Sequence, residues 1–152
     1  MIGASRIARR RVAATFERLS RGQWDAIVAD LAPGVHHVFP GDHPLGGERH
    51  TREGVLRWFE RLGRLYPGHE FEVHRVSASG RPWDMWVAVQ WTAHLRPRVG
   101  DPYDNDGAHW IRVRRGKVVY FHASLDTQLI ADACRRMAAA GVVEAAASPV
   151  VD

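Results

Sequence analysis

The segment that most constrains the fold lies in the last third of the chain. Two strand-like runs, 107–114 and 117–125, are joined by a two-residue turn, and a helical pattern follows from 127 to about 140. So short a turn joins strands only as an antiparallel hairpin. The pattern therefore predicts a β-hairpin that leads directly into a helix.

The second strand of this hairpin carries polar side chains at alternate positions. Successive side chains of a strand point to opposite faces. Counting back by two from Asp126 places Ser124, His122 and Tyr120 on one face. The other face is apolar, with Val119, Phe121, Ala123 and Leu125. A carboxylate and an imidazole on one strand face suggest a polar cluster inside a cavity, so we expect this face to point inward.

The remaining periodicity indicates helices before strands. Helices are expected over 5–20, 23–31, 52–65 and 127–140, and strands over 35–39, 69–79, 84–96, 107–114 and 117–125. Thr51 is the expected N-cap of the third helix. Three helices before a set of hairpins indicate the α+β class. We expect one domain over 1–152, with an Ala-rich tail at 141–152 that is loosely held.

Composition narrows the class of protein. The chain has 152 residues, of which 45% are hydrophobic and 25% charged, as in a soluble globular protein. It contains neither an apolar run of membrane-spanning length nor a secretory signal, so no membrane partner is expected. The single cysteine, Cys134, fits a reducing compartment, and we expect a cytoplasmic protein.

The charge and the histidine content indicate whether the chain should bind nucleic acid or a metal ion. The net charge is +4, but Lys117 is the only lysine and the arginines are interleaved with acids, which argues against a nucleic-acid partner. A basic nucleic-acid-associated protein is kept as a third hypothesis. The nine histidines form no HExxH motif, and the adjacent His36 and His37 point opposite ways in a strand. No metal site and no cofactor are predicted.

Several segments together resemble a known family. FPGDHPLGG at 39–47 precedes the helix REGVLRWFERL at 52–62, and GKVVYFHASLDT spans 116–127. Tyr103 and Asn105 form a Tyr-x-Asn pattern before the penultimate strand. Over nearly its whole length the chain resembles the SnoaL-like, polyketide-cyclase-related branch of the nuclear transport factor 2 superfamily. The resemblance implies a cone-shaped, strongly curved antiparallel sheet packed on three N-terminal helices, with a C-terminal helix. It also implies a pocket for a small apolar molecule, and a homodimer.

The resemblance assigns roles to Asp126 and His109, and strand alternation adds His122. Asp126 matches the carboxylate that acts as general base in polyketide cyclases and limonene epoxide hydrolases, although an aspartate before a helix is also a favoured N-cap. His122 shares a strand face with Asp126, and from that position it would be a proton partner, a substrate donor or a satisfied core histidine. His109 falls where steroid isomerases of this fold carry an oxyanion-hole aspartic acid.

Four positions depart from the better-known enzymes of the fold. Phe39 and Thr15 replace the base and the oxyanion-hole tyrosine of steroid isomerases. Trp91 and Ala93 occupy the positions at which epoxide hydrolases carry an arginine and an aspartate. These departures favour a cyclase-like mechanism with a single base, or no catalysis.

The resulting hypothesis is a cofactor-free cyclase or isomerase-type enzyme acting on an apolar, carbonyl-bearing, polyketide-like molecule. Its predicted catalytic residues are Asp126, His122 and His109, and its predicted substrate-binding residues are Asn105, His37, Phe39, Trp91, Trp58 and Tyr120. The alternative is a non-catalytic ligand-binding or dimerisation module. We expect a homodimer through the outer face of the sheet, where Trp86, Trp110 and Arg112 should point.

Overall fold

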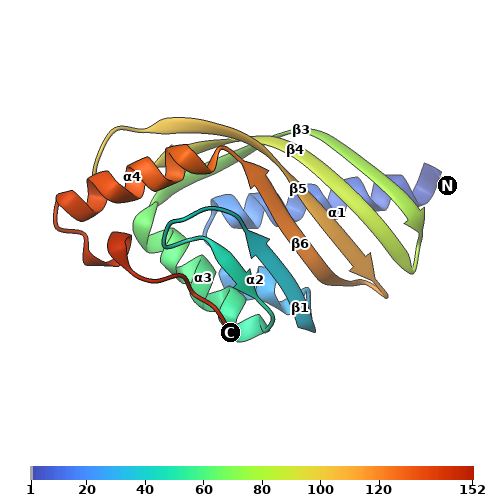
Figure 1. The fold of residues 1–152 in the computed structure, drawn as a ribbon. Helices are drawn as coiled ribbons and strands as arrows, with labels where there is room; N and C mark the ends of the chain where they lie inside the picture. Colours follow the sequence, from blue (N-terminus) through green and yellow to red (C-terminus); the bar gives the residue numbers. More distant parts are fainter. Residues whose placement is uncertain (1) are drawn as a thin grey trace.

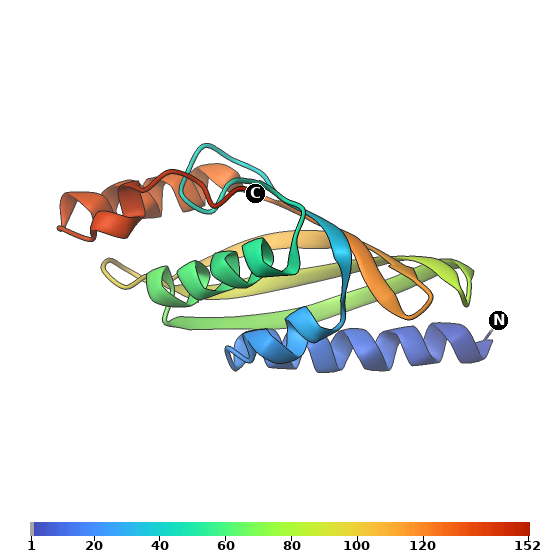
Figure 2. The same cartoon turned by 90° about the horizontal axis from the view of Figure 1, so that it is seen from below.

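Six strands form one curved sheet, and three helices pack against its concave side (Figures 1 and 2). This computed structural model describes residues 2–152. The helices are α1 (Ile2–Ser20), α2 (Trp24–Ala29), α3 (Arg52–Leu65) and α4 (Thr127–Ala139), with a short 3-10 helix, η1 (Val143–Ala146). The strands are β1 (Leu31–Phe39), β2 (Gly47–Arg49), β3 (Gly68–Arg81), β4 (Asp84–Arg96), β5 (Tyr103–Arg114) and β6 (Lys117–Leu125).

The strand order across the sheet is β2-β1-β6-β5-β4-β3. Neighbouring strands are antiparallel, except that β1 runs parallel to β6. The predicted α+β class and curved sheet are confirmed, and the sheet is mixed because of this one parallel pair. The short strand β2 was not predicted, since no strand was expected between 39 and 69.

Helix α3 shows how local sequence fixes one wall of the core. The Thr51 hydroxyl accepts a hydrogen bond from the Gly54 backbone N–H at 3.0 Å, which confirms the predicted N-cap. The apolar residues of the helix recur at helical spacing and are buried. They are Val55, Trp58, Phe59, Leu62 and Leu65.

Strand register decides which side chains enter the core. In β6, Phe121 and Ala123 are buried, and they pair with Ile111 and His109 of β5. The polar side chains of the intervening positions therefore lie on the outer face. The prediction that the polar face of this strand points inward is wrong, because the helices cover the apolar face and remove it from water.

The C-terminal segment packs against the rest of the chain, contrary to the expected loose tail. The Arg49 guanidinium donates to the Val150 carbonyl at 2.7 Å, and Arg61 donates to the Ser148 carbonyl at 2.7 Å. Glu144 of η1 forms ion pairs with Arg61 and Arg64 of α3. These contacts tie the last residues to α3 and β2.

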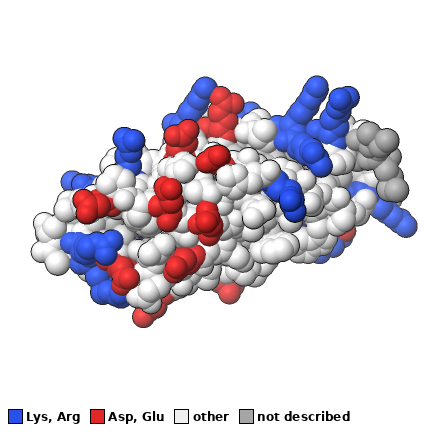
Figure 3. All heavy atoms as spheres, turned by 90° about the horizontal axis from the view of Figure 1, so that it is seen from above, with Lys and Arg blue, Asp and Glu red and all other residues white. Residues whose placement is uncertain are grey.

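Charge on the sheet side of the molecule is mixed. On the face drawn in Figure 3, Asp and Glu side chains gather in a group, with Lys and Arg toward both ends. Among the described residues drawn on this face, the acidic group and uncharged residues separate the basic side chains. Among the described helices, none has the length and apolar character needed to cross a membrane. Cys134 is buried in α4, as expected of a small core residue.

Candidate functional site

A cavity of about 330 Å³ lies between the helices and the concave face of the sheet. Its walls are almost entirely apolar. They include Phe16 and Leu19 of α1, Trp58, Phe59 and Leu62 of α3, Phe71 of β3, Val87 and Trp91 of β4, Ile111 of β5, Phe121 of β6 and Ile130 of α4. Such a space suits a small organic molecule, since ligand pockets of proteins begin near this volume.

The cavity opens at one end of the cone. Its exposed lining residues are Ile7 and Arg11 of α1, Pro82 of the β3–β4 turn and Gly116 of the β5–β6 turn. Figure 1 shows these two turns beside the N-terminal part of α1. At the opposite end the lining residues Trp58, Tyr66 and Leu95 are buried. A ligand would therefore enter between α1 and the two turns.

One imidazole stands among the apolar walls. The indole N–H of Trp91 on β4 donates to Nδ1 of His109 on β5 at 2.8 Å. Gly107, the cross-strand partner of Trp91, makes this contact possible. A Cβ atom at Gly107 would lie 2.6 Å from the Trp91 ring, so a larger residue would push the indole away.

The His109 ring is neutral and of defined tautomer. Burial, together with the nearby His122, lowers the pKa of His109 to about 4. Because Nδ1 accepts the Trp91 hydrogen bond, the ring proton resides on Nε2. For Nε2 the described residues supply no hydrogen-bond partner. His109 therefore offers a single N–H donor to a ligand in the cavity.

Besides Arg11 at the mouth and Tyr66 at the buried end, two further polar side chains line the cavity. Thr15 of α1 donates its hydroxyl to the Arg11 carbonyl at 2.9 Å, so its oxygen retains acceptor capacity. Asp30, which ends α2, is the one carboxylate among the described lining residues. It forms an ion pair with Arg18 at 3.4 Å, and both side chains are partly exposed. Asp30 was not among the predicted site residues, because the helix expected over 23–31 contained it, whereas α2 ends at Ala29.

Asp126 lies outside the cavity. Its carboxylate is exposed and caps α4, accepting from the backbone N–H groups of Gln128 at 3.0 Å and Leu129 at 3.4 Å. The prediction that Asp126, His122, His109 and Asn105 converge on one cavity is wrong. Of the two roles considered for Asp126, the structure shows the helix cap.

The other predicted polar residues are also placed elsewhere. His122 and Tyr120 lie on the outer face of β6, where the Tyr120 hydroxyl is 3.0 Å from Nδ1 of His122. Asn105 is buried, but its side chain binds the backbone of Asp126, donating to the carbonyl at 2.9 Å and accepting from the N–H at 3.2 Å. It positions the start of α4 and does not reach the cavity.

His37 belongs to a separate buried cluster. Its Nδ1 accepts from Nε of Arg49 at 2.9 Å, and its ring stacks on Phe121 with centroids 4.1 Å apart. Burial is the first cause that lowers its pKa, and the charge of Arg49 is the second. Among the described residues, nothing bonds to its buried Nε2. His37 is not a cavity residue, so its predicted substrate-binding role is corrected.

Four predicted site residues do line the cavity: Phe39, Trp58, Trp91 and His109. Trp58 is fixed by a hydrogen bond from its indole N–H to the Leu45 carbonyl at 2.7 Å. Within the described chain, the one group of three side chains close enough to share a metal ion lies outside the cavity. It consists of His36, Glu48 and His50.

Comparison with known proteins gives a consistent result. A nuclear transport factor 2-like protein of unknown function from Burkholderia pseudomallei is similar in structure, with a TM-score of 0.73 and 21% identity over 81% of this chain and 93% of that chain. A second such protein, from Burkholderia thailandensis, has a TM-score of 0.65 and 28% identity over 80% and 92%. TerC, co-crystallised with polyporic acid, has a TM-score of 0.69 and 19% identity over 80% and 92%.

A search of curated protein sequences found no match. The model of the SnoaL-like domain matches residues 12–121, which include the C-terminal part of α1, all of α2 and α3, and most of the sheet. The segments that first suggested this resemblance form the β1–β2 region, α3 and β6, which surround the cavity. The chain therefore belongs to the SnoaL-like domain family.

Proposed function

We propose that the protein binds a small, mostly apolar molecule that carries an oxygen acceptor, and that His109 holds this oxygen. The observation that supports the proposal is a single neutral imidazole, oriented by Trp91, in a largely apolar cavity. An apolar wall binds by removing ligand surface from water, whereas one donor sets the orientation. A carbonyl or phenolic oxygen suits an N–H donor, and an ammonium group does not.

The fold relatives support a ligand of this kind. TerC was co-crystallised with polyporic acid. For this chain we infer a polyketide-like molecule, in the general sense of a compact carbon skeleton with a carbonyl group. The absence of any lysine or arginine at the buried end of the cavity, as far as the lining residues are described, favours an uncharged ligand.

A matched pair of ligands tests the role of His109. Tetralone carries a carbonyl, and tetralin has nearly the same shape without it. We expect calorimetry to show tighter binding of tetralone by about fivefold, which corresponds to one hydrogen bond of about 1 kcal/mol. His109→Phe should remove the preference, because phenylalanine fills the space but donates nothing. His109→Gln should retain part of it, since an amide can accept from Trp91 and donate to the ligand.

His122→Gln is the control, since His122 lies on the neighbouring strand but on the outer face. It should bind both molecules as the unaltered protein does. Equal binding of tetralone and tetralin by the unaltered protein, or a preference that survives His109→Phe, would reject the proposal.

A second candidate function is a cofactor-free isomerase or cyclase-type reaction in the same cavity. It is favoured by Asp30, a carboxylate that lines the cavity with His109. Asp30 would remove a proton next to the ligand carbonyl, and the electron pair of the broken C–H bond would move to the oxygen as an enolate. His109 would stabilise that oxygen through Nε2–H, and Asp30 would return the proton to carbon.

Exchange of the protons beside the tetralone carbonyl with deuterium from D₂O reports this step directly by NMR. We expect Asp30→Asn to abolish protein-dependent exchange and Asp126→Asn to leave it unchanged. Ligand binding without exchange would identify a binding module and exclude the catalytic candidate. This outcome would leave the binding proposal standing.

A further inference from the structure

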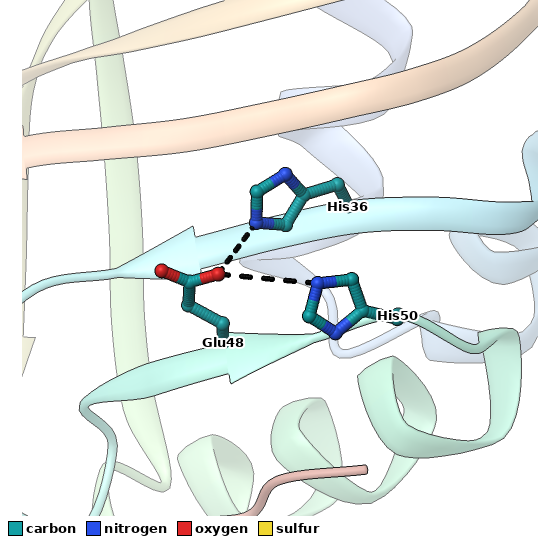
Figure 4. A group of neighbouring side chains, drawn as sticks. All are labelled: His36, Glu48 and His50. Carbon is teal, nitrogen blue, oxygen red and sulfur yellow. Dashed lines mark hydrogen bonds and ion pairs between the residues drawn. The ribbon is translucent and has the colours of Figure 1, made fainter.

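We propose that His36, Glu48 and His50 form a binding site for one divalent transition-metal ion of the Zn²⁺ type on the outer side of the sheet. The three side chains converge from β1, from β2 and from the residue just beyond β2 (Figure 4). Their candidate ligand atoms all lie within 4.8 Å of one another. This site lies outside the cavity, and the proposal does not rest on the function proposed for the cavity.

Strand pairing brings the three groups together. Glu48 and His50 are two positions apart, so they project from the same side of an extended chain. Across the β1–β2 ladder, Val38 pairs with Glu48 and His37 pairs with Arg49. Continuing this antiparallel register places His50 opposite His36, and their rings stack with centroids 4.7 Å apart. No metal site was predicted from the sequence, because it contains no HExxH motif and His36 was compared only with its neighbour His37.

The distances leave room for an ion after small rotations. Nε2 of His36 is 2.7 Å from Oε2 of Glu48, and Nε2 of His50 is 3.9 Å from the same oxygen. In a tetrahedral site with ligand distances of about 2.0–2.2 Å, neighbouring ligand atoms lie about 3.3–3.6 Å apart. Movement of exposed side chains by less than an ångström or so reaches this arrangement. All three are at least partly exposed, so these movements disturb no core packing.

The donor set indicates the class of ion. Two imidazole nitrogens and one carboxylate suit Zn²⁺ and its transition-metal neighbours, whereas Ca²⁺ and Mg²⁺ prefer oxygen ligands alone. Three protein ligands leave a fourth position for water.

A second histidine cluster on the sheet provides a contrast. His94 contacts Asp104 through Nδ1 at 2.7 Å and Glu72 through Nε2 at 3.0 Å. The two carboxylates therefore lie on opposite sides of one ring, and a single ion cannot bind all three groups. This cluster makes His94→Gln the matched control for the proposed site.

A bound ion would link β2 to β1, because its ligands come from both strands. Between these strands lies the loop from 40 to 46, and Phe39 and Leu45 at its ends line the cavity. Metal binding should therefore stabilise the buried end of the cavity from outside. Since an ion that binds only the folded chain raises its stability with concentration, Zn²⁺ should raise the melting temperature.

Calorimetric titration of the untagged full chain with Zn²⁺, after removal of metals by EDTA dialysis, tests the site. We expect one ion per chain for the unaltered protein and for His94→Gln. His36→Gln and His50→Gln should abolish this binding, and Glu48→Gln should weaken it by at least about tenfold. Zn²⁺ should raise the melting temperature of the unaltered protein and of His94→Gln, but not that of the three variants of the site.

Circular dichroism of the metal-free variants confirms that they are folded, which their exposed positions lead us to expect. Co²⁺ in place of Zn²⁺ should give the visible absorption of a tetrahedral site in the unaltered protein and not in His50→Gln. The proposal fails if the unaltered chain binds no Zn²⁺. It also fails if His36→Gln and His50→Gln bind Zn²⁺ as tightly as His94→Gln does.

Discussion

Trp91 on β4 holds His109 on β5 through a hydrogen bond of 2.8 Å from its indole N–H to Nδ1. The contact crosses the strand pair diagonally, over Gly107, and it fixes both the tilt and the tautomer of the imidazole. A side chain of β4 thus orients the His109 imidazole of β5. The Nε2–H donor of His109 therefore has a fixed direction before any ligand binds.

Trp91→Phe tests this relationship. Without the indole donor, Nδ1 of His109 can carry the ring proton, so we expect a mixture of tautomers. Nitrogen NMR of the histidine ring distinguishes the two forms. The preference for tetralone over tetralin should fall together with the fraction protonated at Nε2. Trp110→Phe is the control. It removes an indole N–H that donates to Ser124 on the outer face, so His109 should keep one tautomer.

Stability should decline on mild acidification. His109 has a pKa of about 4 in the folded protein and about 6.5 when unfolded. Between these values the unfolded chain binds a proton that the folded chain does not, so stability is lost as the pH falls from about 6.5 to about 4. From pH 7 to pH 5 the expected loss from His109 is about 1–2 kcal/mol.

Urea unfolding at the two pH values measures this loss. His109→Gln should show a smaller decline, because it lacks the titrating group. It should keep some decline, since the pKa of the buried His37 is lowered too. Identical declines in the two proteins would contradict the assignment.

The helix cap of Asp126 makes a different prediction. Asp126→Ala should cost about 1 kcal/mol of stability because two backbone N–H groups at the start of α4 lose their acceptor, whereas Asp126→Asn should change stability little. Neither should alter tetralone affinity. Thermal unfolding and calorimetry separate the two effects. A loss of ligand affinity in Asp126→Asn would show that this carboxylate takes part in ligand binding.

Arg49 should be more important for stability than its place on a short edge strand suggests. Its buried guanidinium donates to His37 and to the carbonyls of Gly46, Gly47 and Val150. Burial lowers its pKa to about 10, so it stays charged at neutral pH. Arg49→Met should leave several buried acceptors unpaired and cost about 2–4 kcal/mol.

Limited proteolysis should then cut the C-terminal segment earlier, because its anchor at Val150 is lost. Arg64→Met is the control. Arg64 also contacts this segment, through Glu144, but it is exposed, and exposed ion pairs contribute about 0–1 kcal/mol. Equal effects of the two substitutions would contradict the importance given to burial.

The homodimer remains a prediction, although the side chains expected to form it lie where the sequence analysis placed them. Trp86 and Trp110 are 43% and 47% exposed on the outer face, and the Arg112 guanidinium lies 5.5 Å from the centre of the Trp86 ring. Exposed tryptophan side chains of this size favour a partner. We expect light scattering to give the mass of a dimer, and Trp110→Arg to give that of a monomer. A monomer of the unaltered chain at high concentration would refute the prediction.

The fold could be predicted because its signals are local. The apolar spacing of α3, its cap at Thr51 and the short β5–β6 turn each specify one element without reference to the rest of the chain. His109 could also be identified, because the resemblance places it at the oxyanion-hole position of steroid isomerases, and it does line the cavity.

The site was less predictable. Which face of a strand points inward, and which strands pair, depends on residues far apart in the sequence. Alternation along β6 defines two faces, but only the position of the helices decides that Phe121 points inward and His122 outward. Asp126 follows the end of the strand, where alternation no longer applies. The cluster of His36, Glu48 and His50 depends on pairing between β1 and β2, and β2 is too short to be seen in the sequence pattern.

The alternation of β6 has a consequence for how such a chain can change over generations. Phe121 and Leu125 contact the cavity, while His122 and Ser124 face outward between them. Substitutions that alter ligand choice and substitutions that alter the outer surface therefore fall on separate sets of codons within one strand. A descendant can acquire a new ligand while retaining the surface of its ancestor, and the reverse is equally open to it.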